Sequence, residues 1–150
     1  MKMQEIERIL TFAIEEEEKA ANLYRHLATK ATDTGLRESL LGFAAEEEQH
    51  KASLENVMIG DLTMFASADA DSIMYSEECT QPTLSPGTMT LRQALRFAIT
   101  AEQKAFRLYM TLASATDDAG LTTIFKALAQ QEAAHAKRFE ILFDQIMVEN

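Results

Sequence analysis

The feature that most constrains the fold of this chain is an internal repeat with a constant spacing. The segment FAIEEEEKAANLYRHLA, which begins at Phe12, matches FAITAEQKAFRLYMTLA, which begins at Phe97. The shift from position 12 to position 97 is 85 residues, and the same shift relates Glu47 to Glu132 without a gap. A chain of 150 residues can bury one sizeable core but not two independent ones. We therefore expect one domain that contains a duplicated unit.

Each copy of the repeat contains two stretches whose core-facing positions recur at steps of four and three residues. This spacing is typical of helices that pack in a bundle. Asp33 and Asp118 lie where the second helix of each copy needs an N-cap, and Thr90 with Gln93 fits a capping box before the third helix. We call the core-facing positions the seam: Ile6, Leu10, Ala13, Glu17, Ala20, Tyr24 and Leu27; Leu36, Leu40, Phe43, Glu47, His50, Leu54 and Val57; Leu91, Leu95, Ala98, Glu102, Ala105, Tyr109 and Leu112; Leu121, Phe125, Leu128, Glu132, His135, Phe139 and Leu142.

Two copies of a helical hairpin are too few for a solenoid. They predict an all-α fold, an antiparallel four-helix bundle in which the two hairpins face each other across a pseudo-two-fold axis. We expect one domain over 1–150, with the first hairpin at about 2–59 and the second at about 90–148.

A segment of different character, about 60–89, separates the two hairpins. It contains both prolines and no sustained helical period, although a short helix at Asp69–Tyr75 is compatible with its sequence. Helices of ~25 residues run ~37 Å, so a crossover of this length can carry the chain along the bundle. It would also let hairpins exchange between subunits, so we expect a homodimer, with hairpin swapping as one form of it. Cys79, the single cysteine, cannot form an internal disulfide.

The charge of the chain excludes some classes of partner. There are 24 acidic and 14 basic residues, which give a formal net charge of -10. Such a chain repels phosphate backbones and anionic lipids, so we expect neither nucleic acid nor membrane as a partner. No apolar run approaches the ~20 residues that span a bilayer, and the charged start MKMQEIERIL is unlike a signal peptide. We therefore expect a cytoplasmic protein.

Four glutamates and two histidines occupy seam positions, where charged groups are not expected. Burying carboxylates without compensation costs about several kcal/mol per ion, and no seam position carries Lys or Arg. Two divalent cations would supply the missing positive charge, and two neutral imidazoles would complete their coordination. The glutamates next to these positions are interpreted as solvated surface charges: Glu15, Glu16, Glu18, Glu46 and Glu48.

The seam glutamates and histidines are predicted to lie in one layer of the bundle. In an antiparallel hairpin, residues equidistant from the turn lie at the same depth, and the midpoint of positions 17 and 47 is 32, beside Asp33. The midpoint of positions 102 and 132 is 117, beside Asp118. The spacing E-x-x-H places a carboxylate and an imidazole one turn apart on one face. The sequence therefore predicts a site for two metal ions formed by Glu17, Glu47, His50, Glu102, Glu132 and His135.

At these residues the sequence resembles the rubrerythrin and erythrin branch of the ferritin-like superfamily, whose ligand helices read E-x-x-A-x-x-x-Y and E-x-x-H. Here these motifs are Glu17-Ala20-Tyr24, Glu47-His50, Glu102-Ala105-Tyr109 and Glu132-His135. The resemblance covers essentially the whole chain apart from the linker. It implies a ferritin-like bundle with a di-iron site.

The resemblance also implies a role for each motif residue. Glu47 and Glu132 would bridge the two irons, and each iron would take one histidine. Glu17 and Glu102 would be terminal ligands. Tyr24 and Tyr109 are either hydrogen-bond donors behind the glutamates or amphipathic core residues with hydrated hydroxyls. Carboxylate and imidazole suit several divalent metals, so two iron ions are the expected cofactors and manganese and zinc are alternatives.

The function that the resemblance implies is a di-iron oxidoreductase that reduces hydrogen peroxide or dioxygen. Full-length rubrerythrins carry paired C-x-x-C motifs that deliver electrons, and this chain has only Cys79. We therefore expect an external electron donor, a rubredoxin-like protein or a flavoprotein. Rubrerythrins also tend to place a second carboxylate three residues after the ligand of the third helix. Ala105 stands there, which predicts a symmetric site.

Two other functions stay open at this point. A ferroxidase or iron-handling protein would use the same ligands but release the oxidised iron. A non-catalytic bundle would hold two metal ions, such as zinc or manganese, for structure and partner binding. The ligand types alone do not choose among these functions.

Overall fold

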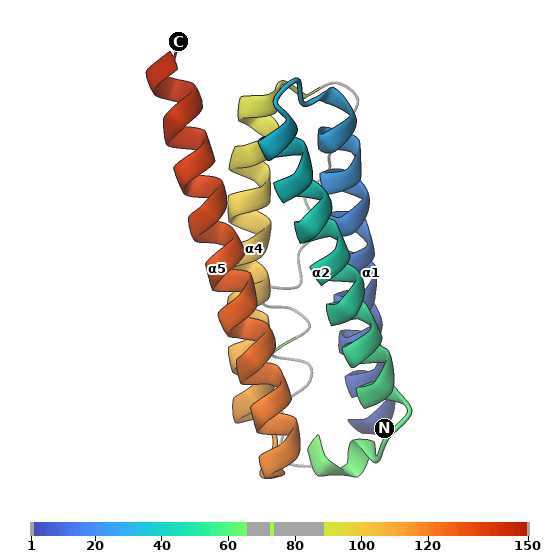
Figure 1. Ribbon diagram of the computed structural model, residues 1–150. Helices are drawn as coiled ribbons and strands as arrows, with labels where there is room; N and C mark the ends of the chain where they lie inside the picture. Colours follow the sequence, from blue (N-terminus) through green and yellow to red (C-terminus); the bar gives the residue numbers. More distant parts are fainter. Residues whose placement is uncertain (1, 66–72, 74–88, 150) are drawn as a thin grey trace.

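The computed structural model describes residues 2–65, 73 and 89–149. Over these residues the chain forms four long α-helices, which stand side by side as a bundle (Figure 1). They are α1 (Lys2–Lys30), α2 (Thr34–Met58), α4 (Leu91–Ser114) and α5 (Ala119–Glu149). The predicted all-α four-helix bundle is confirmed.

The helices pack as two hairpins, α1 with α2 and α4 with α5. The turns of the two hairpins lie at opposite ends of the bundle (Figure 1). A short 3-10 helix, η1 (Leu62–Phe65), follows α2 and lies at the end opposite to the start of α4. The hydroxyl of Thr116, in the turn before α5, donates to the Met64 carbonyl at 2.7 Å. Residues that follow the first hairpin are thereby joined to the turn of the second.

The helix starts are capped as the sequence predicts. Asp33 accepts a hydrogen bond from the Leu36 amide at 2.7 Å, and Asp118 accepts one from the Leu121 amide at 2.9 Å. Thr90 and Gln93 form the complete capping box at the start of α4. A side chain of this kind at an N-cap stabilises a helix by about 1 kcal/mol, because it pairs an amide that the helix leaves open.

A polar layer divides the core into two apolar clusters. The cluster at the η1 end includes Ile9, Phe65 and Phe125, and the cluster toward the turn of the first hairpin includes Leu40 and Phe139. Every seam position is buried or half-buried. The layer between the clusters is formed by the seam glutamates and histidines, so the fold places these charged groups in the middle of its core.

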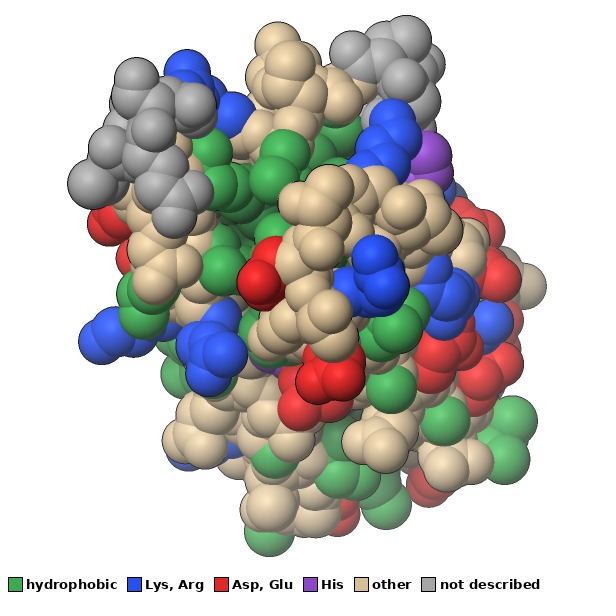
Figure 2. All heavy atoms as spheres, turned by 45° about the horizontal axis from the view of Figure 1, so that its top comes forward, with side chains coloured by type: hydrophobic (Ala, Val, Ile, Leu, Met, Phe, Trp, Pro, Cys, Tyr) green, Lys and Arg blue, Asp and Glu red, His purple; other side chains and the backbone are tan. Residues whose placement is uncertain are grey.

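Figure 2 shows one face of the molecular surface, where charged side chains are expected. This face mixes acidic, basic and apolar side chains, with a group of acidic ones along its right-hand side. In the part of the chain that the structure describes, none of the helices has a stretch both apolar enough and long enough to cross a bilayer.

Some expectations for the linker concern residues outside the described ones. Cys79 lies outside the described residues, and so does the expected short helix at Asp69–Tyr75 apart from Ile73. Ile73 is helical and buried. The 3-10 helix η1 was not expected from the sequence, because its apolar residues are too few to show a period.

Candidate metal centre

The six seam residues that carry charge converge at mid-bundle. Each hairpin supplies three of them, with one glutamate from its first helix and an E-x-x-H pair from its second. None of the six is more than 3% exposed, although each is a charged or polar residue. In order of the helices α1, α2, α4 and α5, they are Glu17, Glu47 with His50, Glu102, and Glu132 with His135.

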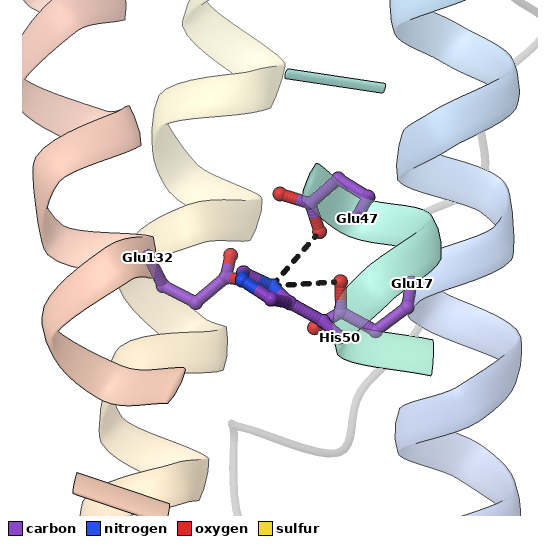
Figure 3. A group of neighbouring side chains, drawn as sticks. All are labelled: Glu17, Glu47, His50 and Glu132. Atoms are coloured by element: carbon purple, nitrogen blue, oxygen red, sulfur yellow. Dashed lines mark ion pairs between the residues drawn. The ribbon is translucent and has the colours of Figure 1, made fainter. Parts of the chain in front are cut away.

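The six residues form two overlapping groups of ligand atoms. Within each group the atoms lie no more than 4.8 Å from one another, which is the arrangement that one metal ion requires. Figure 3 shows the first group, in which Glu132 of α5 points toward His50 and the two glutamates of the first hairpin. The first group is Glu17, Glu47, His50 and Glu132, and the second is Glu47, Glu102, Glu132 and His135. Only Glu47 and Glu132 belong to both groups.

Both imidazoles turn the same nitrogen, Nδ1, toward the carboxylates. His50 Nδ1 lies next to Glu132 Oε1, 3.5 Å from Glu17 Oε2 and 3.7 Å from Glu47 Oε2. His135 Nδ1 lies 2.8 Å from Glu47 Oε1 and 3.7 Å from Glu102 Oε1. The two rings are stacked, with centroids 5.9 Å apart and an interplanar angle of 19°. Each Nδ1 is therefore in the position of a ligand atom, and each Nε2 points away from the centre.

Two buried tyrosines hold the glutamates of the opposite hairpin. Tyr24 of α1 donates its hydroxyl hydrogen to Glu102 of α4, and Tyr109 of α4 donates to Glu17 of α1. The two bonds are related by the 85-residue shift, from Tyr24 to Tyr109. Burial and the neighbouring carboxylates raise the pKa of both tyrosines well above 10, so both hydroxyls keep the hydrogen that they donate.

Burial and mutual electrostatic interaction shift the pKa values of glutamates and histidines in the cluster. Burial and the nearby carboxylates raise the pKa of Glu47 and Glu132 well above 4.5. Burial opposes ionisation of Glu17 as well, but Glu47 and His50 favour its ionised form and lower its pKa. Burial alone would lower the pKa of each imidazole, but the carboxylates raise the pKa of His50 to about 10 and that of His135 to about 11. Without a metal ion, the cluster retains protons to reduce its internal repulsion.

Several ligand atoms lack a hydrogen-bond partner. In the described part of the chain, five buried side-chain N or O atoms make no hydrogen bond of acceptable geometry. Four of the five belong to the cluster: Glu17 Oε2, His50 Nδ1, Glu102 Oε2 and Glu132 Oε1. Two of these atoms, His50 Nδ1 and Glu132 Oε1, contact each other as an ion pair, whereas Glu102 Oε2 has no partner of either kind among the described residues. Unpaired buried polar atoms cost about 1–3 kcal/mol each and are rare unless they serve a function. Four carboxylates and two imidazoles fit two divalent cations in number, charge and position.

Comparison with known proteins gives the family. The family model described as Rubrerythrin matches residues 8–69 and 93–150, which is most of the chain. The chain belongs to the rubrerythrin family. Members of this family are generally di-iron proteins. A search of curated proteins and a search of solved structures gave no match for this member of the family.

The sequence interpretation missed two residues that contact the histidines of the centre. Glu46 of α2 is exposed, as expected of a surface charge, but its Oε2 also contacts His135 Nε2 across the α2–α5 interface. Gln131 of α5 was not considered, and its Oε1 contacts His50 Nε2 across the same interface. The signal was available, because position 131 is position 46 shifted by 85 residues and each residue directly precedes a seam glutamate.

A cavity of about 50 Å³ leads into the centre of this rubrerythrin between α1 and α4. Its lining includes the ligand candidates Glu17 and Glu102 and, at its outer part, the half-buried Glu16 and Lys104. Glu16 was expected to be a solvated surface charge but is half-buried, and burial raises its pKa. Ala105, which stands where the family resemblance led us to look for a second carboxylate, also lines the cavity.

Proposed function

We propose that this protein is a di-iron oxidoreductase that reduces hydrogen peroxide or dioxygen with electrons from an external donor. The observation that carries the proposal is the pair of overlapping ligand groups, in which Glu47 and Glu132 are shared. Two separate structural metal sites would not need shared ligands. Two shared carboxylates would hold the ions close enough to act on one small molecule.

The proposal gives each ligand candidate a role. Glu47 and Glu132 would bridge the ions because each belongs to both groups. Glu17 and Glu102 would be terminal ligands, each held by the tyrosine of the other hairpin. His50 and His135 would bind one ion each through Nδ1.

Bound iron ions would supply Lewis acidity and one electron each, so that peroxide accepts two electrons and two protons and yields two molecules of water. The protein contributes a buried site and fixed carboxylates. Tyr24 and Tyr109 hold one oxygen of each terminal glutamate and leave the other, Glu102 Oε2 and Glu17 Oε2, without a hydrogen-bond partner. Those free oxygens can turn toward an ion without first breaking a bond.

The cavity supports a small substrate. A space of about 50 Å³ accommodates peroxide, dioxygen or a few waters, since one water needs about 10–15 Å³ by the same measure. This volume is too small for a larger organic substrate. Electrons would then arrive from a separate protein, which we propose to be rubredoxin-like or a flavoprotein.

The test is single-turnover kinetics of the iron-loaded protein. We would load the full chain with ferrous iron without oxygen, mix it with hydrogen peroxide or with dioxygen, and follow the ferric absorption by stopped flow. The proposal predicts rapid oxidation by at least one of them, recovery of the ferrous state on adding a reductant, and iron that stays bound through repeated cycles. The matched control is Glu55→Ala, which removes an exposed carboxylate from the same helix as Glu47 and should change nothing.

Two results would contradict the proposal. Release of ferric iron after each oxidation would indicate a ferroxidase or iron-handling protein. Iron that binds but is oxidised by neither compound faster than free ferrous iron would indicate a structural dimetal bundle.

A further inference from the structure

The two halves of the metal centre differ at one pair of repeat-related residues. The ligand candidates and the tyrosines are identical in the two copies of the repeat. Glu46 and Gln131 are not, although they occupy equivalent positions and make equivalent contacts. Each crosses the α2–α5 interface to the Nε2 atom of the opposite histidine. His135 therefore has a carboxylate behind it, whereas His50 has an amide.

A carboxylate and an amide act differently on a histidine that binds a metal through Nδ1. The carboxylate of Glu46 accepts a hydrogen bond but cannot donate one, so it requires the hydrogen on Nε2 of His135 and leaves Nδ1 free to bind. Gln131 can present either its oxygen or its NH₂ group to His50, so it enforces neither tautomer. The bond to Glu46 is also charge-assisted, and such bonds are about twice as strong as neutral ones.

We infer that the two metal positions are not equivalent and that the position beside His135 binds a divalent cation first, because Glu46 positions and polarises that histidine. This inference rests on the proposed dimetal function and adds an order of filling to it. Partners of metal-bound histidines typically change metal affinity by about 10- to 100-fold. Glu46 is a positioning residue, since it acts on the ion through His135.

Two effects limit the size of the difference but not its direction. The side chain of Glu46 is 52% exposed, so solvent screens part of its charge. The carboxylate of Glu46 also favours a proton on Nδ1 of His135, and that proton competes with the metal ion. A divalent cation carries twice the charge of a proton, so the carboxylate stabilises the bound cation more than the bound proton. We therefore expect the lower end of the range, about tenfold.

Other differences around the centre do not supply a comparable charge. Phe43 contacts the ring of His135 at 4.9 Å, and its repeat counterpart is Leu128, so both positions are apolar. Glu16 has Ala101 as its counterpart, but Glu16 is paired with Lys19 at 3.5 Å, which offsets its charge.

Anomalous diffraction from crystals of the full chain grown with one equivalent of Co²⁺ tests the inference. Cobalt occupancy is refined separately at the two positions, and a second set of crystals is grown with excess Co²⁺. For the natural sequence, a difference of about tenfold in affinity gives about threefold higher occupancy beside His135 when one equivalent is shared between the two positions, and both positions are filled in excess. Activity plays no part in this measurement.

Three variants separate positioning from a merely structural role. Glu46→Gln and Gln131→Glu each make the pair identical, and should bring the two occupancies close together. The double exchange Glu46→Gln/Gln131→Glu should reverse the order in favour of the position beside His50. Both residues are exposed, so folding should be retained.

The outcomes distinguish this inference from the proposed function. Equal occupancies in the natural sequence, or the same order before and after the exchange, would overturn the inference and leave a dimetal centre in place. No cobalt at either position even in excess would overturn both.

Discussion

At the scale of single residues, the centre depends on contacts between hairpins. Tyr24 follows Glu17 by two helical turns, yet its hydroxyl pairs with Glu102 of the other hairpin. Spacing along one helix shows which side chains share a face, but not which helix that face meets. For the same reason the sequence left two interpretations of the tyrosines open, Glu46 was interpreted only as a surface charge, and Gln131 was not considered.

The first prediction concerns Tyr24→Phe. It removes the hydroxyl that donates to Glu102 Oε1 but keeps the aromatic ring, whose centroid lies 5.0 Å from that of Phe139. We expect the free energy of unfolding of the metal-free protein to fall by about 1–3 kcal/mol, measured by urea denaturation, because a buried carboxylate oxygen loses its partner. Tyr109→Phe should have a similar effect, since it removes the equivalent bond to Glu17. Unchanged stability in both variants would show that neither bond matters.

At the scale of helices, most of the architecture could be predicted from local pattern. The steps of three and four identified the core-facing side of every helix, and the caps at Asp33, Thr90 and Asp118 identified three starts. Both depend on neighbours in the sequence. The cavity could not be predicted, because it depends on how closely α1 and α4 approach at Ala20 and Ala105.

The second prediction concerns Ala105→Leu. A larger side chain at this position fills the cavity between α1 and α4 without touching the charge of any ligand. We expect the rate constant for oxidation by peroxide to fall by about tenfold or more, which corresponds to about 1.4 kcal/mol in the barrier. Stopped flow measures the rate, and iron content per chain should stay unchanged.

The matched control for this variant is Thr111→Leu, which enlarges an exposed residue on the same helix away from the cavity. If Ala105→Leu reacts as fast as the natural sequence with the same iron content, the oxidant reaches the centre by another route.

At the scale of the whole molecule, the fold tolerates a charged layer inside its core only because the charges are compensated. The two apolar clusters supply the burial that stabilises the bundle, and the buried charges of the layer between them lower its stability. Protons provide that compensation in the metal-free protein, and two cations would do so in the loaded one. The stability of the metal-free molecule should therefore depend on pH more strongly than that of the metal-loaded one.

The third prediction gives that dependence its sign. In the folded chain the pKa of His50 is about 10 and that of His135 about 11, against 6.5 ordinarily. Their contribution to stability is fully present below about pH 6.5 and is lost as pH rises through about 10 for His50 and about 11 for His135. The raised pKa values of Glu47 and Glu132 act in the same direction. As pH rises these buried carboxyl groups lose their protons, and their ionised forms destabilise the folded state. Glu17, with its lowered pKa, contributes only in the acid range.

We therefore expect the free energy of unfolding of the metal-free protein to fall from about pH 6.5 to about pH 10, measured by urea denaturation at each pH. The metal-loaded protein is the control, and it should vary less over this range because bound cations replace the protons. Stability of the metal-free protein that rises with pH over the same range would contradict this account of the buried layer.

The measurement that tests the central claim most directly is metal content per chain after purification without added metal, with the visible spectrum recorded alongside. We would compare the natural sequence with Glu47→Ala/Glu132→Ala, which removes both shared ligands. The account predicts about two irons per chain with ferric-oxo absorption in the natural protein, and loss of both in the double variant. If the natural chain binds no metal even after reconstitution with ferrous iron, manganese or zinc, the dimetal centre does not exist and the buried carboxylates need another explanation.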